Sequence, residues 1–145
     1  REEVGREDLS GGIGDGTVGR IAADHVPQSA EEKGRGREKG LMGVVGLETA
    51  FPILYTKLVK TGVLSLEKLI ELMHTNPRNR FCVGTPLEEG QPARLTVYDL
   101  DKEYTINPDD FLSMGRATPF AGEKVFGACR LTMYHGSIAW KDETL

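Results

Sequence analysis

The sequence contains few cysteines and no long apolar run. Its 145 residues include two cysteines, Cys82 and Cys129, which lie far apart and form no CxxC pair. This usage argues against a disulfide framework or a cysteine zinc site and favours a reducing cytoplasm. No apolar stretch approaches the roughly 18 residues of a membrane-spanning helix. The charged start "REEVGRED" does not resemble a signal peptide, so we expect neither export nor a membrane partner.

Concentrated positive charge and paired histidines are also lacking. The net charge is −4, and the basic residues between Lys33 and Lys39 are interleaved with glycine and Glu38. This arrangement indicates an exposed loop and no nucleic-acid partner. The three histidines have neither HxH nor HxxxH spacing, so the chain alone cannot build a complete histidine metal site.

Glycine, by contrast, is abundant near the start, where eleven of the 18 glycines fall in the first 46 residues. The spacing Gly14-x-Gly16-x-x-Gly19 matches a dinucleotide-binding pattern, which needs a strand before it and a helix after it. The preceding residues are polar, however, and the following residues 17–23, "TVGRIAA", are typical of a strand. The pattern therefore predicts a glycine-rich turn.

Two amphipathic helices are predicted in the middle of the chain. Leu47, Phe51, Leu54 and Leu58 form one apolar stripe, and Pro52 is tolerable only in a first turn, which predicts a helix over 49–61. Ser65 as N-cap and the "NP" dipeptide predict a second helix over 65–75.

The remaining segments are predicted to be loops and strands. Polar residues over 29–40 predict an exposed loop. Apolar alternation predicts a strand over 94–101, and "EYTI" over 103–106 predicts another. "RLTMYHGSIAW", 130–140, is typical of a hairpin bent at His135-Gly136-Ser137.

Asp24 and His25 directly follow the apolar end of the 17–23 segment. A continuously apolar strand is typical of burial on both faces, as in parallel sheets. Barrel enzymes place catalytic groups at the carboxyl ends of such strands. Asp24 is therefore a candidate catalytic residue, although an aspartate that only caps the next turn is equally compatible with this position.

Several stretches together resemble the C-terminal portion of bacterial-type dihydroorotases, which are metal-dependent cyclic amidohydrolases. They are "DGTVGRIAADHVPQSAEEK", "GVVGLETAFPILYTKLVKTG", "NPRNRF" and "TPFAGEKVFG". The resemblance implies an α/β fold: the C-terminal fragment of a (β/α)₈ TIM barrel plus part of a small β-sandwich domain. Residues 1–80 would supply the last strand, active-site loop and outer helices of the barrel. Residues 81–145 would supply strands of the small domain.

The resemblance also implies site residues. Asp24 matches the family's catalytic aspartate, which ligates one zinc ion, accepts a proton from the attacking hydroxide and returns it to the departing nitrogen. Gln28 stands where the family has a histidine that binds the substrate carboxylate. Met42 and Gly43 match a loop pair that contacts the substrate through its backbone. The other ligands of the zinc pair lie upstream in the family, so we expect this piece alone to be inactive.

The implied reaction interconverts dihydroorotate and N-carbamoyl-L-aspartate in pyrimidine biosynthesis, in a cytoplasmic and homodimeric enzyme. Three positions depart from the family pattern, namely Gln28, Arg94 and Ala117. These departures leave two alternatives open. One is a non-catalytic dihydroorotase-like scaffold, for example for aspartate transcarbamoylase. The other is a cyclic amidohydrolase of the allantoinase or hydantoinase type.

Overall fold

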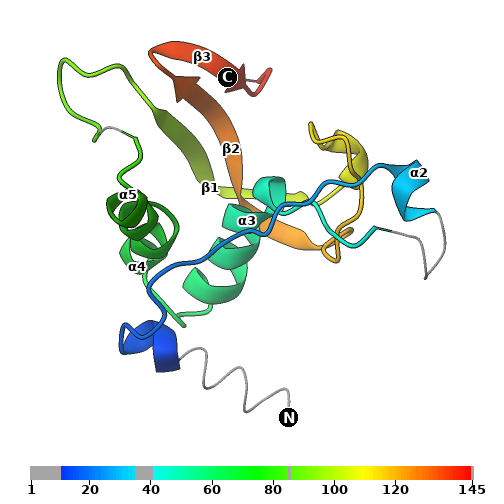
Figure 1. Cartoon of the computed structure of the whole chain (residues 1–145), viewed down its shortest axis with the longest axis horizontal. Coiled ribbons are helices and arrows are strands. Elements are labelled where there is room, and N and C mark those ends of the chain that lie inside the picture. Colours follow the sequence, from blue (N-terminus) through cyan, green and yellow to red (C-terminus); the bar gives the residue numbers. More distant parts are fainter. Residues whose placement is uncertain (1–10, 35–40, 85, 145) are drawn as a thin grey trace. The chain divides into compact units, whose positions relative to one another are not determined.

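The computed structural model describes residues 11–34, 41–84 and 86–144 (Figure 1). These residues divide into two compact units. Unit 1 contains the residues up to Ala22, Lys57–Tyr98 and the residues from Cys129 onward. Unit 2 contains Ala23–Thr56 and Asp99–Ala128. No helix among the described residues has the length and apolarity needed to cross a bilayer.

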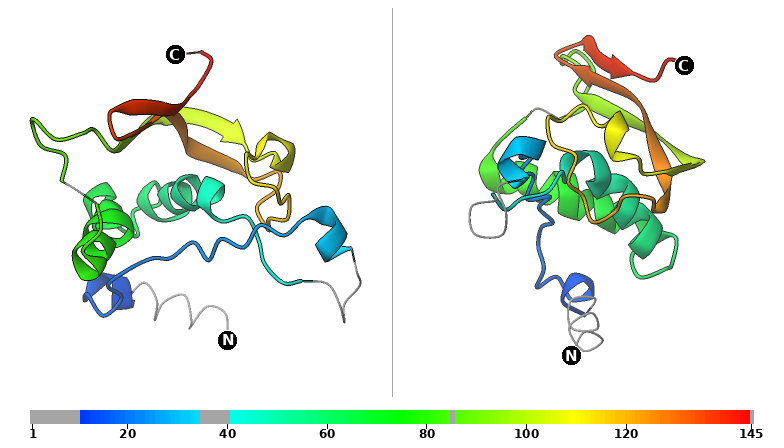
Figure 2. Two further views of the ribbon diagram at one scale, coloured as in Figure 1. Left: turned by 45° about the horizontal axis from the view of Figure 1, so that its top comes forward. Right: turned by 90° about the vertical axis from the view of Figure 1, so that its right-hand side faces the viewer.

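The strands form one three-stranded sheet in the order β1-β2-β3. β1 spans Leu95–Thr105, so the two strands predicted over 94–101 and 103–106 are one continuous strand. β2 spans Lys124–Tyr134 and pairs antiparallel with β3, Ser137–Lys141 (Figure 2).

The predicted hairpin bend lies between β2 and β3. His135 and Gly136 both have positive φ, 50° and 80°, which suits the two-residue turn that matches strand twist. Tyr134 pairs with Ser137 across this turn, and the register shifts between Thr132 and Met133. The hairpin prediction is confirmed, and its first strand begins earlier than the sequence pattern suggested.

Among the described residues, two α-helices belong to unit 2, which also contains a 3₁₀ turn over Pro108–Asp110. α2, Ala30–Lys33, lies inside the predicted 29–40 loop, where Ser29 and Glu32 form a reciprocal capping box. Residues 35–40 lie outside the described part of the chain. α3, Leu47–Leu54, begins two residues before the predicted start, so Pro52 lies beyond its first turn. The chain continues from α3 as a π-helical turn over Tyr55–Val59.

The second predicted helix extends further than expected. Ser65 caps α4, Leu66–Ile70, by accepting the Lys68 N–H at 3.1 Å. A π-helical turn, Glu71–Thr75, then leads into α5, Asn76–Phe81. The prediction that "NP" ends the helix is wrong, because Pro77 lies in the first turn of α5, where its missing N–H costs no hydrogen bond.

The hydrophobic core of unit 2 joins α3 to the sheet. It contains Val45, Ile53, Ile106, Phe111 and Val125, with Tyr104 and Phe120 packed against it. The predicted stripe of α3 is correct for Phe51, which is 6% exposed, but wrong for Leu47, which is 66% exposed. The buried face of α3 is therefore rotated toward Ile53.

The strand predicted over 17–23 is not formed among the described residues. Residues 17–23 are half-buried to exposed and lie in no strand, and the nearest bridge is the parallel pair of His25, just beyond the segment, with Val44. A buried parallel strand needs a strand on each side, whereas the partners described for this segment are helical: the Ile21 N–H donates to the Leu72 carbonyl at 3.1 Å, and the Asn76 side-chain amide donates to the Gly19 carbonyl at 2.9 Å. The glycine-rich turn before the segment is confirmed, since Asp15 accepts the Thr17 N–H at 2.8 Å and Gly16 has φ 86°.

Replacing Ile53 with alanine should test the core of unit 2. We expect Ile53→Ala to lower the free energy of unfolding by about 2–4 kcal/mol, because it removes buried methyl groups and leaves a cavity. Leu47→Ala on the same helix should change it by less than about 0.5 kcal/mol, because that side chain is exposed. Urea unfolding followed by circular dichroism measures both, and equal losses would contradict the observed orientation of α3.

The Glu71 carboxylate should make part of unit 1 sensitive to acid. Hydrogen bonds from Lys68, at 3.0 Å, and then from Asn76 hold the pKa of Glu71 below its ordinary 4.5. This stabilisation is present above pH 4.5 and is lost as the pH falls through the folded-state pKa of Glu71. Glu71→Gln should therefore weaken the loss of stability between neutral and acidic pH. Thermal melts over a pH series would show parallel curves if the carboxylate played no such part.

Candidate functional site

Asp24 lies at the end of the extended segment, with its side chain exposed. Its backbone has φ 44°, a left-handed conformation that is uncommon outside glycine but tolerated by aspartate. The residue thus turns the chain abruptly just before His25 and presents its carboxylate outward. An exposed carboxylate in a fixed turn can accept a proton or bind a cation.

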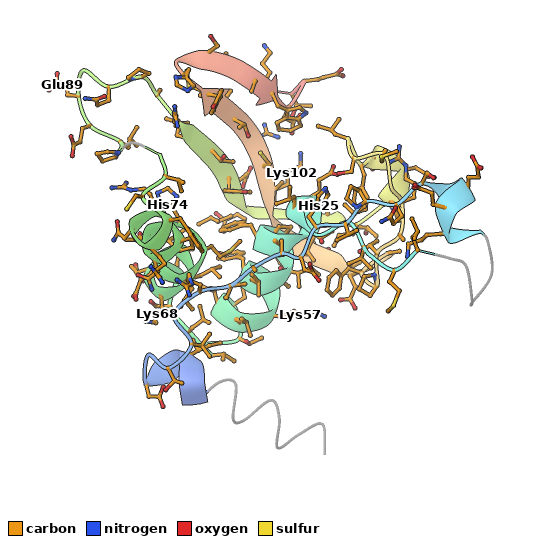
Figure 3. The ribbon with its side chains drawn as sticks, in the orientation of Figure 1. His25, Lys57, Lys68, His74, Glu89 and Lys102 are labelled. Carbon is orange, nitrogen blue, oxygen red and sulfur yellow. The ribbon has the colours of Figure 1, made fainter. Side chains whose placement is uncertain are left out.

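His25 lies against the start of α3 (Figure 3). Its Nδ1 accepts the Gly46 N–H at 3.1 Å and the Leu47 N–H at 3.2 Å. These are among the amides at a helix start that have no partner within the helix. Gly46 has no side chain to cap them, so His25 caps α3 from 21 positions earlier in the chain. Sequence spacing gave no signal for this contact.

Backbone contacts hold residues 23–26 against residues 44–46, which directly precede α3. The Val26 N–H donates to the Val44 carbonyl at 2.9 Å, next to the His25–Val44 bridge. A Cβ on Gly46 would lie 2.3 Å from the Ala23 carbonyl oxygen, so only glycine fits there. The carboxylate of Asp24 is therefore carried by a segment held at several points.

The predicted substrate-binding residues lie on two stretches that both contact Val26. Met42 is 90% exposed. Gly43 has φ 139°, and a Cβ there would lie 2.6 Å from the Val26 carbonyl oxygen. The close approach at Gly43 is therefore to Val26 of the same chain. Gln28 is half-buried, and its backbone N–H donates to Val26 at 3.0 Å.

Glu48, in the first turn of α3, binds a loop that is distant in sequence. Its Oε2 accepts the Leu112 N–H at 2.8 Å, and its Oε1 accepts the Ser113 N–H at 3.1 Å and the Ser113 hydroxyl at 2.5 Å. The sequence analysis did not single out Glu48. An acidic residue in a first helical turn was the available signal, but that pattern usually reflects the helix dipole.

The same loop contacts the segment that carries Gln28. A Cβ on Gly115 would lie 2.9 Å from the Gln28 carbonyl oxygen and 2.9 Å from Pro27 Cα. Further along, the Ala117 carbonyl accepts the Val45 N–H at 2.8 Å. This contact uses only the backbone of Ala117, so the departure from the family residue at this position does not disturb it.

A metal centre is not assembled by the described residues. No group of three histidine, cysteine, aspartate or glutamate side chains that could hold a metal ion occurs among them. Asp24 is a suitable oxygen donor, but a single carboxylate does not hold a zinc ion, which takes about four ligands. Asp24 is therefore at most one ligand of a centre completed by residues outside the described part.

No protein-family model matches the chain. A curated relative, the dihydroorotase of Bacillus cytotoxicus, is 46% identical over 144 residues. The match covers 97% of this chain and 34% of the relative, so the chain spans about a third of the relative's length.

Two solved structures have a similar fold. An L-hydantoinase (dihydropyrimidinase) from Arthrobacter aurescens superposes with a TM-score of 0.79 at 32% identity, over 92% of this chain and 31% of that one. A D-hydantoinase from Bacillus sp. AR9 superposes with a TM-score of 0.85 at 24% identity, over 99% of this chain and 33% of that one.

These structural neighbours are amidohydrolases with a TIM-barrel fold, and this chain matches a part of them with helices and a small antiparallel sheet. The barrel parentage expected from the sequence is thereby confirmed, while the chain itself contains only a fragment of it. The sequence comparison thus relates the chain to about a third of a dihydroorotase, and the structural comparison relates it to about a third of a hydantoinase.

Proposed function

We propose that this chain supplies the catalytic carboxylate and part of the substrate site of a zinc-dependent dihydroorotase. The complete enzyme would interconvert dihydroorotate and N-carbamoyl-L-aspartate in pyrimidine biosynthesis. The observation that carries the proposal is the 46% identity to a dihydroorotase over 97% of this chain. Residues up to about 80 would belong to the barrel, and β1, β2 and β3 to the small β-domain.

Asp24 is the proton carrier in this proposal. Opening a cyclic amide requires a proton to leave the attacking water and another to reach the departing nitrogen. An exposed carboxylate at the end of a segment fixed by His25 can perform both transfers in sequence. A zinc ion, where bound, lowers the pKa of its water toward neutrality. The described residues do not complete such a centre, so no step is assigned to the metal in this chain.

Gln28, Met42 and Gly43 are the proposed substrate contacts. Gln28 would donate its side-chain amide to the substrate carboxylate. Met42 and Gly43 would offer backbone groups on the neighbouring loop, where Met42 is 90% exposed. Both stretches contact Val26, which keeps them close to the segment that carries Asp24.

The proposed enzyme is a cytoplasmic homodimer. The two cysteines, Cys82 and Cys129, lie far apart in the sequence and form no CxxC pair, a usage that suits a reducing compartment. The dimer is carried over from the family resemblance alone.

A second candidate is a non-catalytic scaffold, for example for aspartate transcarbamoylase, and Gln28 favours it. A glutamine amide has no charge, so it binds a carboxylate more weakly than the family's histidine does. A panel of cyclic amides distinguishes the candidates. Turnover of dihydroorotate supports the first proposal, and turnover of a hydantoin or allantoin alone supports the hydantoinase-type alternative. Binding to aspartate transcarbamoylase without turnover supports the scaffold.

Removing the Asp24 carboxylate should abolish most turnover. In the full-length protein, we expect Asp24→Asn to lower kcat for dihydroorotate by roughly 10²- to 10⁴-fold, because the amide cannot carry the proton. Asp101→Asn removes an exposed carboxylate on β1 and serves as the matched control. Steady-state kinetics with both variants decide the matter, and unchanged kcat in Asp24→Asn would exclude Asp24 as the proton carrier.

Restoring the family residue at position 28 should tighten substrate binding. We expect Gln28→His to lower KM for dihydroorotate by about five- to tenfold near pH 6, because a charged imidazolium binds a carboxylate roughly 1 kcal/mol better than an amide does. The gain should fade above pH 7.5 as the imidazole loses its proton. A KM that does not respond to this substitution would place Gln28 away from the substrate carboxylate.

A further inference from the structure

The first turn of α3, residues 46–48, receives side-chain contacts from two directions. His25 binds its free amides, and Glu48, which belongs to the turn, reaches out to Leu112 and Ser113. All of these residues belong to unit 2. The residues on either side of the turn also hold it in place. Val45 is 1% exposed, and the Thr49 hydroxyl donates to the Val45 and Gly46 carbonyls at 3.4 and 3.3 Å.

The contact of His25 determines its tautomer. Because Nδ1 accepts two N–H groups, it carries no proton in this arrangement, and the ring hydrogen lies on Nε2. The contact also links two parts of the proposed site. His25 directly follows Asp24, and its partners Gly46 and Leu47 follow shortly after Met42 and Gly43. The imidazole thereby ties the catalytic carboxylate to the loop that offers the substrate contacts.

The contact of Glu48 links the third part of the site. Its carboxylate holds the loop at Leu112 and Ser113 through three hydrogen bonds. Two residues later the same loop packs Gly115 against Pro27 and Gln28 without room for a Cβ. The position of Gln28 therefore depends on the position of this loop, and the loop depends on Glu48.

These contacts connect Asp24, through His25, to the first turn of α3. Glu48 then connects this turn to the 112–115 loop, and the loop packs against Gln28. We propose that His25 and Glu48 are positioning residues of the dihydroorotase site, with His25 setting the place of Asp24 and Glu48 setting the place of Gln28. The proposal rests on the function proposed above. Neither residue touches the substrate or exchanges a proton with it.

A series at position 25 in the full-length protein separates positioning from simple stabilisation. The Asn side-chain oxygen lies near the place of the histidine Nδ1, whereas a Gln side chain reaches the place of Nε2. We expect His25→Ala and His25→Gln to lower kcat for dihydroorotate by roughly 10- to 100-fold, since small misplacements of a catalytic group cost that much. His25→Asn should restore kcat to within about threefold, because the two amides keep an acceptor.

The companion series at position 48 should act on binding. Glu48→Gln keeps the size of the side chain but places an amide donor against the Leu112 or Ser113 N–H. We expect KM to rise about tenfold with a smaller change in kcat, because it is Gln28 that is displaced. As controls, His74→Ala removes an exposed imidazole and Glu88→Gln neutralises an exposed carboxylate, and each should leave both constants unchanged.

Two further readouts keep the outcomes separate. Wild-type protein without dihydroorotase turnover overturns the proposed function. In that case, ¹⁵N spectra still test these contacts. They require an unprotonated Nδ1 at His25, and they require the Gly43 amide resonance to shift in His25→Ala but not in His25→Asn. Equal kcat for His25→Ala and the wild type, or loss of activity that tracks loss of folded protein by circular dichroism, overturns the positioning roles.

Discussion

The free amides at the start of α3 are the constraint on which the rest of unit 2 depends. A helix start leaves backbone donors without partners, and their burial is costly unless an acceptor is supplied. Gly46 cannot supply one from its own side chain, so an imidazole from the extended segment does. The turn that carries these amides also carries Glu48, which holds the 112–113 loop. One backbone requirement thus brings three distant segments together.

The residues that make this arrangement differ in kind from those that would perform chemistry. Asp24 is exposed and Met42 almost entirely so, whereas Gly46 and Thr49 are buried. Reactive groups must reach a substrate, whereas the proposed positioning residues His25 and Glu48 are half-buried, between these two extremes. The exposed carboxylate on a fixed segment follows this division.

Local sequence patterns predicted the elements whose determinants are local. The hairpin followed from His135-Gly136, and the start of α4 followed from Ser65. Predictions failed where distant residues decide the outcome. The strand at 17–23 lacks flanking strands among the described residues, and the buried face of α3 is set by Ile53 against the sheet. For the proposed site, Asp24 remains a prediction from resemblance. The contacts of His25 and Glu48 span 21 and 64 positions, and no spacing rule reveals them.

The tight packing at Gly46 affects how amino-acid substitutions among relatives of this chain are interpreted. Any side chain there would collide with the Ala23 carbonyl oxygen, so the position tolerates glycine alone even in a protein that catalyses nothing. Invariance at such a position would record steric exclusion and would persist in a homologue that has lost its enzymatic role. A homologue in which Asp24 is replaced but glycine is retained at position 46 would therefore be a pseudoenzyme that has kept its fold.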